Sequence, residues 1–391
     1  MSYAARQWLI LLGLCLGMCV TNGFARFAYG LILPAMRDQL GWSYAQAGWL
    51  NTANALGYIV GALLTMALIG RMNPSRLFGI GMVATTGTLL ATGVHEALWW
   101  QSLWRFLTGV TGALSFSTAG VLAAQLFPGD VRRNALSIAV LFGFGGGLGI
   151  ILAGASLPLM LDVFGPASWP WAWVIVGGAS LVFLPLSLWA AERLRPPVFE
   201  PPPKVRLPLR AMAAEIAGYA AFGMGYIVYL TFLVAWMSAQ DKGPGLIALV
   251  WVMIGVCTSL SPFLWRPVFA RFANGVPLAM ILTGIAAGSV LPVFVPTGFG
   301  LIASAVVFGL SVFMAPGAVT TFTRANLPAT AWGAAISFYT VVFAVAQTLG
   351  PIGAGLIGDA TGSIGTALLV AAAVLLAGAA LALCQRRIDG A

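Results

Sequence analysis

The sequence Asn22-Gly-Phe-Ala-Arg26-Phe-Ala-Tyr29 lies inside a run of largely apolar residues from Trp8 to Leu33. Such a run is long enough to cross a bilayer core of ~30 Å as a helix that rises ~1.5 Å per residue. An arginine near the middle of a membrane helix costs ~3 kcal/mol on insertion scales, so its guanidinium is expected to face water, a partner or a ligand. On an α-helix, Asn22, Arg26 and Tyr29 would share one face. The stretch therefore predicts a positively charged helix face that the rest of the chain encloses.

The composition is that of a membrane protein. The 391 residues are 60% hydrophobic and only 7% charged, with a mean hydropathy of +0.96, whereas soluble domains carry ~25% charged residues. The net charge of +9 comes from basic residues that lie between apolar segments, so no nucleic-acid surface is expected. The cysteines, Cys15, Cys19, Cys257 and Cys384, have neither a disulfide pattern nor metal-ligand spacing, and we expect no metal or cofactor.

The apolar segments predict an all-α membrane protein with twelve transmembrane helices. They cover approximately residues 8–33, 44–68, 77–94, 98–126, 135–160, 170–190, 211–237, 245–265, 277–295, 298–323, 332–357 and 363–384. Between the sixth and seventh segments, the charged and proline-rich stretch 191–210 reads as an extended cytoplasmic linker. We therefore expect two six-helix halves, 1–190 and 211–391.

The two halves resemble each other at an offset of about 200 residues. Four positions of the first half map onto four of the second: Gly109, Pro128, Ala135 and Ser137 onto Gly309, Pro328, Ala335 and Ser337. Equal direction and an even number of helices predict a pseudo-twofold axis along the membrane normal, as in the halves of transporters.

Basic residues predict the orientation. Fifteen of the nineteen lysines and arginines lie on the side of the N-terminus, and only Arg37 and Lys242 lie on the other side. Arg26 and Arg105 lie within segments. By the positive-inside rule, both termini and the linker are expected in the cytoplasm.

Four stretches carry a resemblance to a known family. Twelve helices in two sixes with a cytoplasmic linker resemble the major facilitator superfamily, and RFLTGVTGA (Arg105–Ala113) looks like its fourth-helix motif. GFARFAYGLILPAM (Gly23–Met36), FGFGGGLGIILAG (Phe142–Gly154) and YAAFGMGYIVYLTF (Tyr219–Phe232) resemble its YbfB/YjiJ-like branch. The resemblance implies a bacterial inner-membrane protein whose first, fourth, seventh and tenth helices line a central cavity.

Two departures argue against assigning drug:proton antiport by motif. The loop IGRMNPSR (Ile69–Arg76) lacks the acidic residue of the superfamily's gating motif. The fifth helix has Ile150 where the antiporter signature has proline, and the Gly350-Pro351 pair occurs in the eleventh helix instead.

Polar and aromatic residues at helical spacing are the candidates for substrate binding. They are Asn22, Arg26, Tyr29, Asn54, Gln101, Arg105, Thr108, Tyr226, Tyr229, Trp251, Tyr339 and Gln347. The alternative for the polar members is hydrogen bonding between helices. For Arg105 the alternative is a structural role, in which it bonds backbone carbonyls at a helix break.

Acidic residues are nearly absent from the segments. Only Glu215 falls inside one, a turn into the seventh helix, far from the arginines. Two fixed positive charges without a nearby carboxylate predict an anionic substrate as their counter-ion, because guanidinium binds carboxylate or phosphate bidentately. Glu215 is the candidate for proton coupling, and anion exchange is the alternative.

The sequence thus predicts a monomeric, non-enzymatic secondary transporter of a small organic anion, first of all a carboxylate, that works in the bilayer by alternating access. An exporter of amphipathic drugs or metabolites, driven by protons, is the alternative. In that case the aromatic residues would dominate the cavity and the arginines would be structural.

Overall fold

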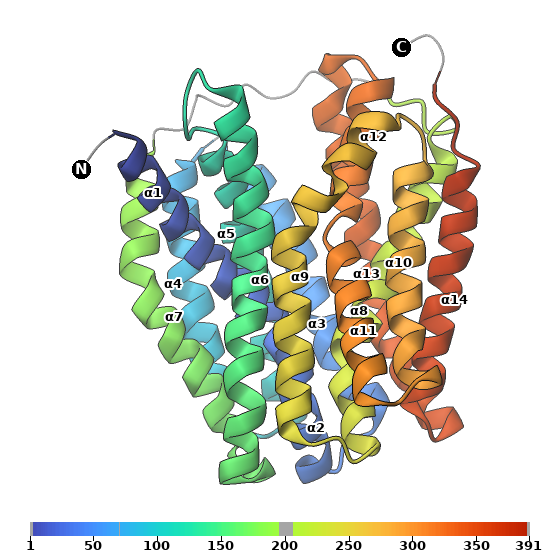
Figure 1. Cartoon of the computed structure of the whole chain (residues 1–391). Helices are drawn as coiled ribbons and strands as arrows, with labels where there is room; N and C mark the ends of the chain where they lie inside the picture. Colours follow the sequence, from blue (N-terminus) through green and yellow to red (C-terminus); the bar gives the residue numbers. More distant parts are fainter. Residues whose placement is uncertain (1–2, 70, 195–205, 389–391) are drawn as a thin grey trace.

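The computed structural model describes residues 3–69, 71–194 and 206–388, and these residues form a bundle of helices (Figure 1). The N-half contains α1 (Tyr3–Met18), η1 (Cys19–Phe27), α2 (Ala28–Leu40), α3 (Tyr44–Leu68), α4 (Pro74–Thr92), α5 (Leu98–Ala123), α6 (Val131–Phe164), η2 (Pro166–Ser168) and α7 (Trp169–Glu192). The C-half contains α8 (Ala213–Ala239), α9 (Pro244–Arg271), α10 (Val276–Phe294), α11 (Gly298–Val312), α12 (Ala315–Asn326), η3 (Ala329–Ala331), α13 (Trp332–Thr361) and α14 (Ile364–Leu383).

These helices make twelve spans, as the hydropathy pattern predicted. Within the described residues, eleven helical runs are long and apolar enough to cross a membrane, counting 3–40 and 298–326 as one run each. The twelfth span is the more polar helix α4, which packs between α5 and α7. The all-α, twelve-helix prediction is therefore confirmed.

The halves meet through two equivalent helix pairs. In one, α6 packs on α9, and in the other α13 packs on α3. A rotation that exchanges the halves places the fifth span, α6, on the eleventh, α13. It also places the eighth span, α9, on the second, α3, so the two contacts are related by the pseudo-twofold axis. Glycines permit this close approach: a Cβ on Gly147 would lie 2.5 Å from the carbonyl oxygen of Gly255, and a Cβ on Gly48 would collide with the carbonyl oxygen of Pro351.

Two spans depart from the regular α-helices that the sequence predicted. The first span contains the π-helix η1 between α1 and α2. The tenth span is interrupted between α11 and α12, where Pro316 lacks the N–H that a continuous helix would need. The two breaks face each other across the halves, since the rings of Phe27 and Phe313 are 5.5 Å apart.

The hydrogen bonds that join the halves are confined to one part of the fold. Between described residues they link Arg26 with Tyr226 and Gln347, Asn51 with Thr231, Thr52 with Thr348, and Asp359 with Tyr44 and Ala45. They extend from η1 to the end of the bundle where α2 ends and α3 begins. This end, which we call the closed end, is opposite to the end where α1 begins and α14 ends (Figure 1).

The predicted linker 191–210 begins inside a helix. Helix α7 continues to Glu192 and is followed by a turn at Arg193. Residues 195–205 lie outside the described residues. The division into 1–190 and 211–391 stays a prediction.

Candidate functional site

The first span places Arg26 between the two halves. Arg26 lies in η1, where Gly23 packs so closely on Gly149 of α6 that a Cβ on either glycine would collide with the other. Single-turn π segments inside helices are frequent at functional sites. The Arg26 side chain crosses from this break to α8 and α13 of the C-half, and only 9% of the residue is exposed.

The guanidinium of Arg26 is held by neutral groups. Its Nη2 donates hydrogen bonds to the hydroxyl of Tyr226 at 2.9 Å and to Oε1 of Gln347 at 2.7 Å. The Tyr226 hydroxyl donates in turn to the same Gln347 oxygen at 3.3 Å. The guanidinium also lies over the ring of Tyr58, 4.8 Å from its centroid.

No carboxylate neutralises this charge in the part of the chain that the structure describes. The ion pairs there are Arg37–Asp38 and Arg133–Asp130, and both are at the ends of helices. Hydrogen bonds to neutral acceptors leave the charge of the guanidinium uncompensated, so a bound anion would add the attraction of an opposite charge. The Arg26 environment can therefore bind a carboxylate.

Arg105 has a different environment. Its Nη1 donates at 2.7 Å to the carbonyl oxygen of Ala25, inside η1, and its Nη2 approaches Oδ1 of Asn51 at 3.4 Å. The guanidinium also lies over the rings of Tyr29 and Trp173, at 4.9 and 5.5 Å. Arg105 is completely buried in the N-half. These contacts correspond to the structural alternative, an arginine that bonds a carbonyl at a helix break.

The predicted common face of Asn22, Arg26 and Tyr29 does not form. The Tyr29 hydroxyl donates to the carbonyl oxygen of Ala47 at 2.7 Å, and its ring packs on Arg105 inside the N-half. The physical reason is η1: its wider turn accommodates extra residues, and one residue corresponds to about 100° of rotation. Asn22 remains near the interface of the halves, beside Gly146, with Oδ1 buried and without a hydrogen-bond partner among the described residues.

Three further N-half candidates bond within their own half. The side-chain amide of Asn54 donates to the carbonyl oxygen of Arg105, and Thr108 bonds the preceding turn of its own helix. Gln101 donates to the carbonyl oxygens of Thr92 and His95 and so fixes the connection between α4 and α5. None of these contacts reaches Arg26.

The C-half candidates divide in the same way. Tyr226 and Gln347 contact Arg26, whereas Tyr229 stacks on Phe308 at 3.9 Å and shares a hydrogen bond with Ser304 inside the C-half. Trp251 is fully buried against Gly30 and Gly154, in the contact between the halves.

A column of aromatic rings leads away from Arg26 within the C-half. Tyr226 stacks on Phe222 at 4.7 Å and on Phe343 at 5.7 Å, and Tyr219 continues the column with Phe222 at 5.6 Å. The ring of Tyr339 stands edge-on to Tyr219 at 5.6 Å. Phe343 was not among the predicted residues, although it lies four residues from both Tyr339 and Gln347, and this helical spacing could have identified it.

Glu215 lies beyond the far end of this column. The residue is fully buried, and neither carboxylate oxygen has a hydrogen-bond partner among the described residues. Its backbone N–H donates to Oε1 of Gln385 at 3.1 Å, which anchors the start of α8 to the end of α14. Eleven residues of α8, or ~16 Å at ~1.5 Å per residue, separate Glu215 from Tyr226.

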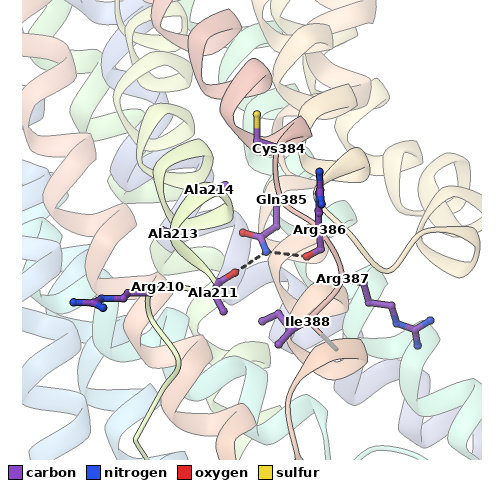
Figure 2. A pocket seen from close by; sticks show the side chains of 9 residues that line it. All are labelled: Arg210, Ala211, Ala213, Ala214, Cys384, Gln385, Arg386, Arg387 and Ile388. Carbon is purple, nitrogen blue, oxygen red and sulfur yellow. Dashed lines mark hydrogen bonds between the residues drawn. The ribbon is translucent and has the colours of Figure 1, made fainter. Parts of the chain in front are cut away.

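A surface pocket of about 440 Å³ lies close to Glu215, where α8 begins (Figure 2). Gln385 is one of the lining residues, and its Nε2 donates to the carbonyl oxygens of Ala211 and Arg386. Figure 2 shows the guanidinium groups of Arg210 and Arg387 pointing away from each other. A smaller pocket lies between α2 and α8 at the closed end. Neither pocket is lined by a predicted substrate-binding residue.

The chain is similar to known carriers. Residues 18–383 match the family described as "Uncharacterised MFS-type transporter YbfB". The chain is 29% identical over 176 residues to a gallate transporter of Pseudomonas putida, in an alignment that covers 40% of this chain and 38% of that protein. It is 26% identical over 178 residues to the 4-hydroxybenzoate transporter PcaK of Acinetobacter baylyi, in an alignment that covers 46% of this chain and 37% of that protein. Both alignments therefore span less than half the length of the relative.

A solved structure shows the same fold. The crystal structure of the nucleoside transporter NupG superposes with a TM-score of 0.72 at 14% identity, covering 97% of this chain and 98% of that one. At this identity the similarity concerns the fold alone. The family match, in contrast, covers most of the sequence. The chain is therefore a multi-pass membrane protein that belongs to the YbfB-type family of major facilitator superfamily transporters.

Proposed function

We propose that this transporter moves a small organic anion, in the first place an aromatic carboxylate, by alternating access of its two halves. The observation that supports the proposal most strongly is the position of Arg26, a buried cation that contacts both halves and whose partners among the described residues are neutral. A carboxylate bound to Arg26 would form charge-assisted bonds at the point where the halves meet.

The surroundings of Arg26 support an aromatic substrate. The rings of Phe222, Tyr226 and Phe343 stack at 4.7–5.7 Å beside the guanidinium, and Tyr58 lies beneath it. Aromatic side chains offer offset-stacked and edge-on contacts to a substrate ring. Gallate and 4-hydroxybenzoate, which appear in the names of two relatives, are both aromatic carboxylates.

In this proposal the candidate residues have two roles. Arg26, Asn22 and Tyr226 contact the substrate, together with the surrounding rings, and Gln347 adjoins Arg26 where the substrate binds. Arg105 positions Arg26 by bonding the Ala25 carbonyl within η1. The remaining candidates, namely Tyr29, Asn54, Gln101, Thr108, Tyr229, Trp251 and Tyr339, support the helices that form the site.

The orientation and the coupling are also part of the proposal. The excess of basic residues supports a cytoplasmic location of both termini, which would put the closed end at the outer side of a bacterial inner membrane. The protein functions as a monomer. Glu215 carries the coupling proton in this proposal, because its buried carboxyl group has no hydrogen-bond partner among the described residues and can bind a proton at little structural cost.

A ligand panel tests the proposal. The melting temperature of the purified protein is measured in detergent with gallate, 4-hydroxybenzoate and benzoate, and with cationic amphiphiles of similar size. A ligand at a hundredfold excess over its Kd stabilises by about 2.7 kcal/mol, so the carboxylates should raise the melting temperature. Stabilisation by cationic amphiphiles alone would instead support the exporter of amphipathic compounds.

A further inference from the structure

The amide oxygen of Gln347 lies at the guanidinium of Arg26, where the carboxylate of an anionic substrate would bind. Its Oε1 lies 2.7 Å from Nη2 of Arg26, and the residue is fully buried on α13. Its Nε2 has no hydrogen-bond partner among the described residues. The oxygen of the Gln347 amide therefore accepts from Arg26, while its N–H groups remain unbonded among the described residues beside the same guanidinium.

An amide oxygen is a suitable temporary partner for this arginine. A buried guanidinium without an acceptor would carry a desolvation penalty. The neutral Gln347 oxygen reduces that penalty but leaves the charge in place, whereas a carboxylate at this position would neutralise it. Because a carboxylate adds the attraction of an opposite charge and can accept two parallel N–H groups of the guanidinium, an incoming carboxylate can displace the amide.

The contact also joins the halves. Arg26 belongs to η1 of the N-half and Gln347 to α13 of the C-half. On the closed-end side of this contact, the next bond between the halves runs from the hydroxyl of Thr52 to the carbonyl oxygen of Thr348, the neighbour of Gln347. A ligand that separates Arg26 from Gln347 therefore acts directly on the segment of α13 that holds the halves together.

We propose that Gln347 is a neutral placeholder for the substrate carboxylate, which occupies Arg26 in the empty transporter and is displaced by anions but not by neutral molecules. This inference rests on the proposed function. It makes Gln347 a specificity-determining residue: a glutamate at the same position would neutralise Arg26 permanently and exclude the substrate.

Two substitutions with opposite expected effects test the placeholder. The melting temperature is measured with and without 4-hydroxybenzoate, gallate or benzoate. Gln347→Glu should melt no lower than wild type without ligand, but its affinity for carboxylates should fall by about tenfold or more, so the ligand-induced shift is lost. Gln347→Leu should melt lower without ligand, because Arg26 loses an acceptor, and should show a larger ligand-induced shift.

The control is Gln240→Glu, which adds the same charge at an exposed position at the end of α8 and should behave like wild type. A wild-type-like shift in Gln347→Glu would refute the placeholder. Loss of the shift in Gln347→Leu would also refute it, because Gln347 would then be an ordinary substrate contact. If wild type itself responds to no carboxylate, the proposed function fails and the placeholder fails with it.

Discussion

The carboxylate of Asp359, at the end of α13, accepts hydrogen bonds from the backbone N–H groups of Tyr44 and Ala45, at the start of α3, at 2.7 and 2.9 Å. A negative charge at a helix N-terminus is favourable, because the first N–H groups have no partner within the helix. The two helices connected in this way belong to different halves. The contact therefore connects the two halves at the closed end of the transporter, and we call it the latch.

Asp359→Asn should weaken this latch. The amide retains an oxygen for one N–H group but loses the charge, which at an exposed helix terminus is worth roughly 0.3–1 kcal/mol. The share of molecules opened at this end should then rise up to about fivefold. Spin labels at Gln46 on α3 and Thr361 on α13, in a variant without native cysteines, would report the separation of the two helices.

Asp241→Asn is the matched control for this experiment. It removes the same charge from the connection between α8 and α9, at the same end of the fold. Unchanged distances in Asp359→Asn would show that the latch does not hold the halves closed.

Hydropathy and charge were sufficient to predict the spans but not their internal breaks. The twelve segments and the six-plus-six division of spans follow from where apolar residues are continuous. The π-helix η1 depends instead on the packing of Gly23 against Gly149, a contact between the first and fifth spans that periodicity along one segment does not contain. The predicted position of Tyr29 was wrong for this reason.

The polar candidates also show that the sequence of a single segment does not reveal which helix a side chain faces. Spacing along a helix identified Arg26, Tyr226 and Gln347, which the structure brings together. It also selected Gln101 and Thr108, which satisfy hydrogen bonds within the N-half. A polar residue that faces another helix of its own half and one that faces the opposite half have the same spacing, so sequence alone did not separate them.

Arg105→Ala should destabilise the fold. The substitution removes the hydrogen bond to the Ala25 carbonyl and the contacts with the rings of Tyr29 and Trp173. Leaving a buried carbonyl without a partner costs about 1–3 kcal/mol. The melting temperature without ligand should therefore fall clearly, as measured in detergent. If it does not fall and only carboxylate binding is lost, Arg105 contacts the substrate directly.

Glu215→Gln should separate transport from accumulation. Because neither carboxylate oxygen has a hydrogen-bond partner among the described residues, the amide should fit without a loss of stability. The variant is expected to bind carboxylates and exchange them across proteoliposome membranes, but not to accumulate them against a gradient when a proton gradient is applied. Glu192→Gln, an exposed substitution at the end of α7, is the control. Accumulation that survives Glu215→Gln would place the coupling elsewhere.

Arg26→Lys should fold normally and bind the substrate weakly. Lysine retains the charge but cannot hold a carboxylate through two parallel N–H groups. The loss of about one charge-assisted bond, ~1.5–3 kcal/mol, corresponds to roughly ten- to a hundredfold in Kd. Titration of the wild type and the variant with 4-hydroxybenzoate would measure this ratio. Equal affinities would mean that bidentate binding is not used.

The central claim is that the substrate anion binds to Arg26, and uptake of labelled 4-hydroxybenzoate by proteoliposomes containing Arg26→Ala tests it most directly. The variant should fold, because Tyr226 and Gln347 remain bonded to each other and a membrane-buried charge is removed. Wild-type protein should take up the compound, and the variant should show no uptake above protein-free liposomes at an unchanged melting temperature. Wild-type rates of uptake by a folded Arg26→Ala variant would contradict the account.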